Sequence, residues 1–293
     1  MKSIFTLLGL QVGHTQQQMA KANNYIFTRA GSPAAHRLAS TGNATKLELW
    51  TKIESQYQEM LQEKGGQELI DLDQTCTEMG QTLLNSQQIK EGNEEDQFLS
   101  MSQQDLFQVV NWKFGKGKKR NALWKHLKAN EEDFIKECTR TSLQKALRIE
   151  DAADQVLIRE TINDLTELKG VGPATASAIL SFVRPDIYTF MDDEIIEALH
   201  PGKRDYTLKT YMEVNDKCLA LANGLGNDWN VRKVGYTLWT AARIYTSGGE
   251  DLTVLETEQN DGTEETSKES HRSHRVTRSV ERNKGPSKRR KKR

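Results

Sequence analysis

Apolar residues recur at helical spacing through most of the middle of the chain, whereas the alternation that marks a half-buried strand is scarce. The sequence has no internal repeat at the periods of solenoid proteins. The pattern therefore predicts an all-α fold built from successive amphipathic helices. The apolar stripes of these helices cover residues 50–61, 106–112, 156–168, 176–183, 195–199, 208–221 and 231–242.

Local signals mark some of the helix ends. The pair Gly65-Gly66 follows the first apolar stripe, and glycine there is typical of a helix C-terminus, so we expect that helix to stop. Ser102 and Asp105 stand ahead of Leu106 with the spacing of a capping box, which predicts a helix start. Residues 48–247 are interpreted as one helical domain.

The two ends of the chain differ from this domain in composition. Residues 1–47 contain five basic residues and no acidic one, and we expect them to be partly disordered. Residues 250–265 hold seven acidic residues and no basic one, and residues 267–293 hold twelve basic and two acidic ones. So little apolar surface cannot offset the entropy of ordering, which predicts a disordered acidic-then-basic tail at 248–293.

Composition also limits the classes of function. Cys76, Cys138 and Cys218 lie far apart with no C-x-x-C pair, which argues against a disulfide framework, a zinc module or a four-cysteine iron–sulfur cluster. We expect no metal ion and no other cofactor. No apolar run approaches the roughly 20 residues that span a bilayer, so no membrane partner is expected.

The basic run at 288–293 predicts recognition by the nuclear import machinery, and therefore a nuclear protein. The same run is expected to tether the chain to DNA without sequence preference. A mitochondrial location stays open as the alternative, because the acid-poor segment 1–46 has the composition of a transit peptide.

The strongest motif is a tight turn between two of the helical stripes. In the segment 168–176, two glycines permit the turn and Pro173 suits the first position of a helix. Such a turn directs backbone N–H groups outward, where they can hold a DNA phosphate without reading a base. The predicted phosphate-binding residues are Lys169, Gly170, Val171 and Gly172.

A second DNA-facing surface is predicted in the segment 113–128. It carries seven basic residues and no acidic one, interleaved with Trp124 and two glycines. Such a run suits contact with phosphates, although runs of charge also occur on solvated surfaces that bind nothing. The residues predicted to contact DNA here are Lys116, Lys118, Lys119 and Arg120.

The hairpin and the residues after it resemble a known enzyme family. The pattern Leu168-x-Gly-Val-Gly-x-x-Thr-Ala-x-x-x-Leu180 resembles the hairpin of the HhH-GPD superfamily of DNA glycosylases, and residues 190–194 resemble its Amun-type members in metazoans. The resemblance implies a two-lobed helical glycosylase fold with a catalytic aspartate after the second hairpin helix, which is Asp193 here. It also implies an enzyme without lyase activity, because Ala174 stands where bifunctional members carry lysine.

The chemistry expected of Asp193 follows from the charge that develops on the sugar. Cleavage of an N-glycosidic bond builds positive charge that a carboxylate stabilises while it orients the attacking water. Apolar residues downstream predict that a helix starts near Asp192, which is the closest alternative to Asp193. Asp186 is interpreted as a turn residue. Five aromatic residues are candidates for a base pocket, although aromatics more often fill a core: Trp112, Phe114, Trp124, Tyr188 and Phe190.

Two functional hypotheses follow. The first is a monofunctional DNA glycosylase of base-excision repair, which hydrolyses the bond of a flipped damaged or modified base and works as a monomer. The second is a non-catalytic helix-hairpin-helix protein that binds DNA in chromatin or transcription. Both expect DNA as the partner, contacted mainly through phosphates, and a carboxylate inside a pocket distinguishes them.

Overall fold

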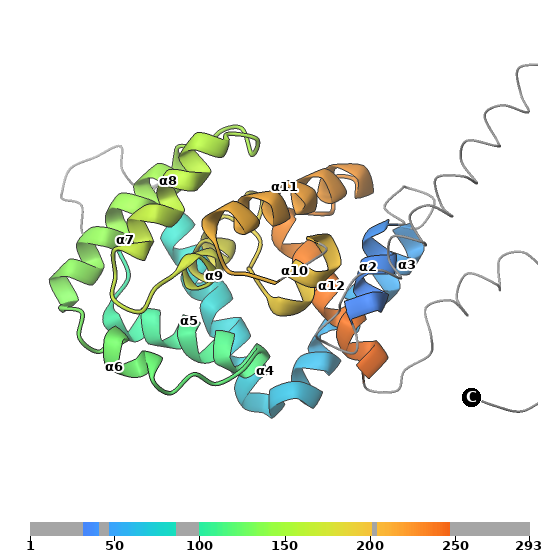
Figure 1. The fold of residues 1–293 in the computed structure, drawn as a ribbon, viewed down its shortest axis with the longest axis horizontal. Coiled ribbons are helices and arrows are strands. Elements are labelled where there is room, and N and C mark those ends of the chain that lie inside the picture. The colour runs from blue at the N-terminus through green and yellow to red at the C-terminus, as the bar shows by residue number, and fades with distance from the viewer. Residues whose placement is uncertain (1–31, 41–46, 86–99, 201–203, 247–293) are drawn as a thin grey trace, which may run out of the picture.

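The computed structural model describes residues 32–40, 47–85, 100–200 and 204–246, which fold mostly as α-helices joined by short loops (Figure 1). No strand occurs within these ranges, and the all-α prediction is confirmed. In chain order the helices are α2 (Ser32–Ser40), α3 (Leu47–Glu54), α4 (Tyr57–Asn85), α5 (Gln103–Lys116), α6 (Leu123–Leu127), α7 (Glu132–Leu147), α8 (Gln155–Thr166), α9 (Pro173–Val183), α10 (Asp193–Leu199), α11 (Leu208–Leu225) and α12 (Val231–Thr246).

The helices form two groups with α9 between them (Figure 1). In the first group α7 packs on α8, and α5 packs on α4. In the second group α12 packs on α2, α3, α10 and α11. Helix α4 contacts α9 and α12 and so joins the two groups, and one hydrophobic core runs through both. This arrangement agrees with the two-lobed architecture expected from the sequence.

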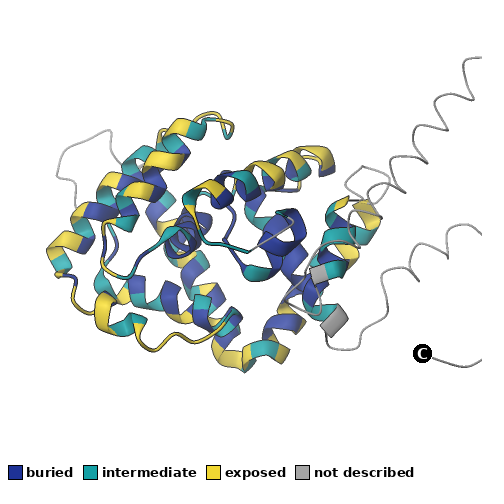
Figure 2. Cartoon of the chain, in the orientation of Figure 1, coloured by how far each residue is buried: buried dark blue, intermediate teal, exposed yellow. Residues whose placement is uncertain are grey.

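Helix α9 is buried around its whole circumference (Figure 2). Every residue from Ala174 to Val183 is buried. Most of these residues are small or aliphatic, so α4, α5, α7, α8 and α11 can approach the helix from several sides. A helix that is apolar all round is one that the core encloses. This enclosure holds both ends of α9 in place.

The predicted helix stop at Gly65-Gly66 is confirmed. Gly66 has non-helical geometry, with φ 67° and ψ −164°, so α4 consists of two helical segments that meet at a kink. Leu69 and Leu83, in the second segment, are buried, and α4 packs on α5 and α9. This packing holds the second segment directly after the stop.

Part of the acid-poor segment 1–47 belongs to the helical core. Helix α2 lies within this segment and packs on α10 and α12. Its residues Ala34, Ala35 and Leu38 are buried. Residues 1–31 and 41–46, and the predicted tail at 248–293, lie outside the described residues.

Three observations on the described ranges concern membrane-spanning helices, metal-ion clusters and cysteine thiols. None of their helices combines the length and the apolar character needed to cross a membrane. Within them, no three His, Cys, Asp or Glu side chains cluster as a metal ion would require. Cys76, Cys138 and Cys218 are buried free thiols, and burial raises the pKa of Cys76 and of Cys218 to about 12, which keeps these two thiols protonated.

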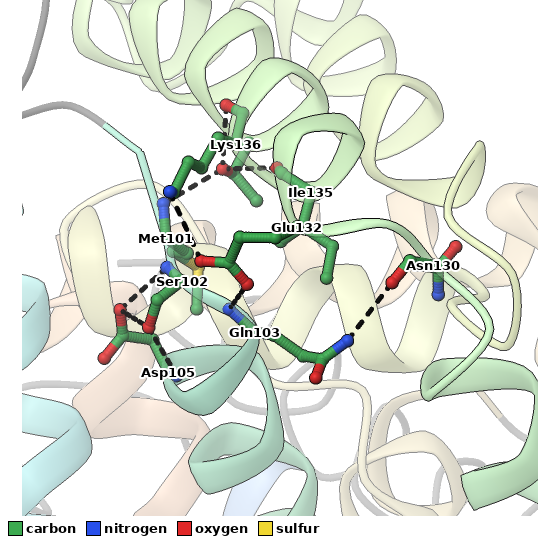
Figure 3. Close-up of polar contacts among 9 residues, drawn as sticks. Met101, Ser102, Gln103, Asp105, Asn130, Glu132, Ile135 and Lys136 are labelled. Carbon is green, nitrogen blue, oxygen red and sulfur yellow. Dashed lines mark hydrogen bonds and ion pairs between the residues drawn. The ribbon is translucent and has the colours of Figure 1, made fainter.

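A polar network joins the starts of α5 and α7 (Figure 3). Ser102 and Asp105 form the predicted capping box, in which the N–H of Ser102 donates to the Asp105 carboxylate at 2.9 Å. Glu132 in the first turn of α7 accepts from the N–H of Gln103 at 2.9 Å. The Gln103 side chain donates to the carbonyl of Asn130 at 3.1 Å. The network fixes α5 against the loop that precedes α7.

We expect Gly80→Ala to destabilise the fold, because a Cβ at Gly80 of α4 would lie 2.2 Å from the carbonyl oxygen of Phe182 in α9. Separating the two helices should lower the free energy of unfolding by about 1–3 kcal/mol. Gly224→Ala in α11 is the matched control, since a Cβ there meets nothing within 4 Å. Urea unfolding of both variants measures the difference. Equal stabilities would contradict the close approach of α4 to α9.

Candidate nucleic-acid interface

The turn between α8 and α9 depends on Gly170. Gly170 has φ 82°, in the left-handed region that other residues rarely adopt. The N–H of Val171 donates to the carbonyl of Leu168 at 3.0 Å and tightens the turn. Gly172 is the N-cap of α9, and Pro173 occupies the first position of the helix. The two helices and this turn form a compact hairpin.

Backbone groups form the open face of this hairpin. The amides of Gly170 and Gly172 donate no hydrogen bond to any of the described residues. A Cβ on Gly172 would meet nothing within 4 Å, so there is room for a ligand atom at that point. Free amides beside the positive end of a helix suit an anion such as a phosphate.

Val171 is not available for the phosphate contact that the sequence predicted. Its side chain is 5% exposed, and its N–H is already bonded to Leu168 within the turn. The prediction that Val171 binds phosphate is therefore wrong, because both of its groups are used inside the protein. Val171 instead anchors the hairpin to the core.

Asn130 holds the hairpin against the loop before α7. Its side-chain amide donates to the carbonyl of Lys169 at 2.9 Å, and its Oδ1 accepts from the N–H of Lys169 at 2.8 Å. Asn130 is 4% exposed, so water competes little for this pair of bonds. The Lys169 side chain is exposed, and its ammonium donates to the carbonyl of Ala129 at 3.2 Å. Sequence reasoning missed Asn130, since an Asn near a helix start is ordinarily interpreted as a cap.

Three of the predicted basic residues lie on the loop between α5 and α6. Lys118, Lys119 and Arg120 are all exposed there. The Arg120 guanidinium carbon lies 5.4 Å from the ring centroid of Tyr206, in cation–π geometry. This loop is available to a phosphate backbone, as are the exposed Lys125 and Lys128 further along the basic segment.

Lys116 is only 1% exposed, so the prediction that it contacts DNA is wrong. Its ammonium lies 4.2 Å from the ring centroid of Trp239 and 5.1 Å from that of Trp112. Burial lowers the pKa of Lys116 to about 8, against the attraction of Asp192 and Asp73. Lys116 falls on the face of α5 that packs into the core, where aromatic rings accommodate its charge.

A cleft of about 260 Å³ brings the hairpin, the basic loop and the start of α10 together. This volume is near the lower end of the range for small-molecule pockets, roughly 300–1,000 Å³. The lining residues are Lys113, Phe114, Gly117, Lys118, Arg120, Leu123, Gly170, Gly172, Pro173, Ala174, Thr175, Phe190, Met191, Asp192, Asp193 and Tyr206. Residues predicted separately for phosphate binding and for catalysis thus share one hollow.

The candidate aromatic residues divide between this cleft and the core. Phe114 and Phe190 line the cleft. Trp112 and Tyr188 are buried in the core, where the Trp112 ring lies 5.0 Å from that of Phe190. Trp124 borders a neighbouring hollow of about 410 Å³. Two of the five aromatics therefore remain candidates for contact with a base.

Asp193, the predicted catalytic residue, is the first residue of α10 and lines the cleft. Both of its carboxylate oxygens have partners. The Tyr206 hydroxyl donates to Oδ1, and Arg204 lies 3.0 Å from Oδ2. Burial, together with this hydrogen bond, raises the pKa of Tyr206 to about 12, so the tyrosine remains a donor. The charge of Asp193 is largely balanced by its own neighbours.

Asp192, the alternative residue, is the N-cap of α10 and is 4% exposed. Its Oδ1 accepts from the N–H of Glu194 at 3.3 Å. Its Oδ2 is buried and has no hydrogen-bond partner among the described residues. The carboxylate of Asp192 interacts electrostatically with two lysines, Lys113 and Lys116. The neighbouring residues Asp192 and Asp193 therefore have carboxylates in different surroundings.

Lys113 supplies an amine to the same cleft. Its ammonium donates to the hydroxyl of Thr175 in α9 at 2.7 Å. Burial and, to a smaller extent, the charge of Arg120 lower the pKa of Lys113 to about 8, although Asp192 and Asp193 raise it. The sequence places Lys113 in the basic run but contains no signal that separates it from the exposed lysines.

Asp186 lies outside the cleft, in the turn that follows α9. Its carboxylate accepts from Arg184 Nη2 at 2.7 Å and from Arg184 Nε at 3.0 Å. Arg184 Nη1 also donates to the carbonyl of Ala146 in α7 at 2.7 Å. The interpretation of Asp186 as a turn residue is confirmed.

Comparison with known proteins identifies the hairpin. The family model for the helix-hairpin-helix motif matches residues 157–182, which span most of α8, the turn and nearly all of α9. No curated protein and no solved structure matches the chain significantly. The chain therefore contains a helix-hairpin-helix at the predicted place, and this motif indicates DNA binding through the phosphate backbone.

We expect Gly172→Asp to weaken duplex binding by about tenfold or more, because a negative charge would face the phosphate. The fold should persist, since Gly172 has open space around it and aspartate is a favourable N-cap. Gly172→Ala is the control, and it should bind like the wild type. Fluorescence anisotropy on a labelled duplex measures affinity, and circular dichroism checks the helices. If the two variants bind equally well, the hairpin does not hold the phosphate.

Proposed function

We propose that this protein is a DNA N-glycosylase that excises a base flipped into the cleft between the hairpin and α10. The observation that carries the proposal is the single cleft lined both by Gly170 and Gly172 and by Asp192 and Asp193. A phosphate on the hairpin amides would bring the neighbouring deoxyribose towards these carboxylates. The resemblance to the HhH-GPD superfamily and the motif match at 157–182 support the same function.

Asp192 is the better placed of the two carboxylates for contact with the sugar. Positive charge develops on the sugar as the glycosidic bond breaks, and a negative oxygen beside it lowers the barrier. Asp192 lines the cleft, and its Oδ2 has no hydrogen-bond donor among the described residues. This oxygen is buried, so contact with the sugar requires the side chain to shift towards the cleft. Asp193 is engaged with Tyr206 and Arg204, so it positions these side chains at the rim.

Apolar side chains in the same cleft suit a flipped base. Phe114, Leu123 and Phe190 line the cleft, and extruded bases are held against such side chains. Ala174 also lines the cleft and carries no nucleophile, so water attacks the sugar when the base leaves. The product is an abasic site in an intact strand.

The proposal places the protein in the nucleus, acting as a monomer and imported through the basic run at 288–293. Helix α2 favours this compartment over the mitochondrion, because a transit peptide reaching residue 46 would include α2. Removing α2 would expose the faces of α10 and α12 on which it packs. The charge of residues 267–293 also suits a nonspecific attachment to DNA.

Asp192→Asn and Asp193→Asn test the catalytic assignment. We expect Asp192→Asn to lower base excision by about 100-fold or more, because the amide keeps the shape of the side chain but removes its charge. Asp193→Asn should reduce excision less, and Asp186→Asn is the silent control. The assay is a single-turnover screen of duplexes with alkylated, oxidised, deaminated or methylated bases. A wild type that binds these duplexes but excises nothing would favour the non-catalytic DNA-binding alternative, and a fully active Asp192→Asn would move the assignment to Asp193.

Deletion of residues 248–293 should weaken nonspecific DNA binding and flatten its salt dependence. For every phosphate that the tail neutralises, its removal should reduce the slope of log affinity against log salt by about 0.9. The truncated protein should also fail to accumulate in nuclei, as measured by fluorescence microscopy of a tagged chain. Nuclear accumulation without the tail would contradict import through the basic run.

A further inference from the structure

We propose that Lys113 is an amine nucleophile that gives this protein a second activity, the cleavage of DNA strands at abasic sites. The inference rests on the proposed function, because it requires the cleft to receive the deoxyribose of a flipped nucleotide. It departs from the expectation drawn from Ala174, which implied an enzyme without lyase activity.

The position of Lys113 suits attack on a sugar inside the cleft. Its side chain leaves the last turn of α5, lines the cleft, and donates to Thr175 Oγ1 at 2.7 Å. Thr175 is 2% exposed and follows Ala174 directly, so the amine is held against the start of α9. The amine of Lys113 in α5 therefore lies near the start of α9. Ala174 at that start has only a methyl group, where bifunctional members of the resembled superfamily carry lysine.

The other lysines near the hairpin have different surroundings. Lys116 is also partly deprotonated near neutral pH, but aromatic rings enclose it and it does not line the cleft. Lys118 lines the cleft, but its side chain is exposed to solvent. Lys169 is exposed at the tip of the hairpin and does not line the cleft. Lys113 alone among these four combines enclosure with a place in the cleft wall.

The charged surroundings of Lys113 make its neutral form accessible. Arg120 on the following loop lowers its pKa, Asp192 and Asp193 at the start of α10 raise it, and burial dominates. With a pKa of about 8, roughly half of the Lys113 side chains are neutral at pH 8, against under about 1% for an ordinary lysine. Only the neutral amine has the lone pair that attacks a carbonyl carbon.

The reaction is a balanced elimination that needs no oxidant. The Lys113 amine attacks the aldehyde carbon C1′ of the ring-opened abasic sugar, the C–N bond forms, and the carbonyl oxygen leaves as water. Asp192 removes a proton from C2′ of this protonated Schiff base, and the electron pair expels the phosphate at C3′. Water then hydrolyses the unsaturated Schiff base and releases the amine. One water leaves and one returns, and the strand is cut on the 3′ side of the abasic site.

The test uses the full chain and a duplex that already carries an abasic site, so it does not depend on base excision. Borohydride reduces the Schiff base to a stable amine, and peptide mapping by mass spectrometry locates the adduct. The variants are Lys113→Ala and Lys113→Arg, which keeps the positive charge without the nucleophile. The matched control is Lys209→Ala, at an exposed lysine of α11 that does not line the cleft. Binding to a duplex with a tetrahydrofuran analogue, which has no aldehyde, measures whether the cleft remains intact.

We expect the wild type and Lys209→Ala to form the adduct on Lys113 and to cut the strand. Both Lys113 variants should reduce adduct formation and cleavage by more than about 100-fold while they bind the analogue normally. Trapping by the wild type should rise with pH through about 8, as Lys113 loses its proton. This pH dependence reports the nucleophile, since a merely structural Lys113 would not produce it.

Three outcomes would overturn the inference. They are an adduct that maps to another amine such as a tail lysine, unchanged trapping in Lys113→Arg, and a wild type that binds the analogue but forms no adduct. The last outcome leaves the proposed glycosylase standing if the lesion screen shows excision. Conversely, if cleavage depends on Lys113 but no base is excised in that screen, the proposed glycosylase function is rejected and the proposed lyase activity is retained.

Discussion

The enclosure of α9 is the constraint on which the rest of the site depends. The N-terminus of this helix carries the hairpin, and the segment after its C-terminus leads to the carboxylates at the start of α10. The N–H of Met191 donates to the Ser177 hydroxyl of α9 at 3.0 Å, which ties this segment back to the middle of the helix. The phosphate-binding turn and the acid therefore share one rigid support, as a precisely spaced site requires.

The electrostatics of the cleft come from the core as much as from the surface. The Tyr57 hydroxyl and the Trp112 indole N–H both donate to Asp73 Oδ1 at 2.7 Å, which fixes a buried negative charge. Lys116 interacts with this charge and with that of Asp192. Its positive charge lies in the core, where it attracts the carboxylate of Asp192. A lysine that never meets DNA thus contributes to the site.

Much of the architecture could be predicted because it depends on local signals. Apolar periodicity located α5 and α8 to α12, the Ser102 capping box located the start of α5, and the glycines located the kink in α4 and the hairpin. The periodicity did not locate α2, α7 or the segment of α4 beyond Gly66. The local pattern also assigned Lys116 to the surface, whereas its face of α5 meets the core. Long-range packing decides these features, and local preference does not.

The sequence by itself determined the helical class, the hairpin, and a pair of neighbouring aspartates at a helix start, since spacing along the chain carries all of these. Only the tertiary structure decided which aspartate has an oxygen without a hydrogen-bond donor among the described residues, since Tyr206 and Arg204 reach Asp193 from beyond α10. It likewise separated Lys113 in the cleft from Lys116 in the core, three residues apart on one helix. Burial and charge partners come from segments distant in the sequence, and no local pattern encodes them.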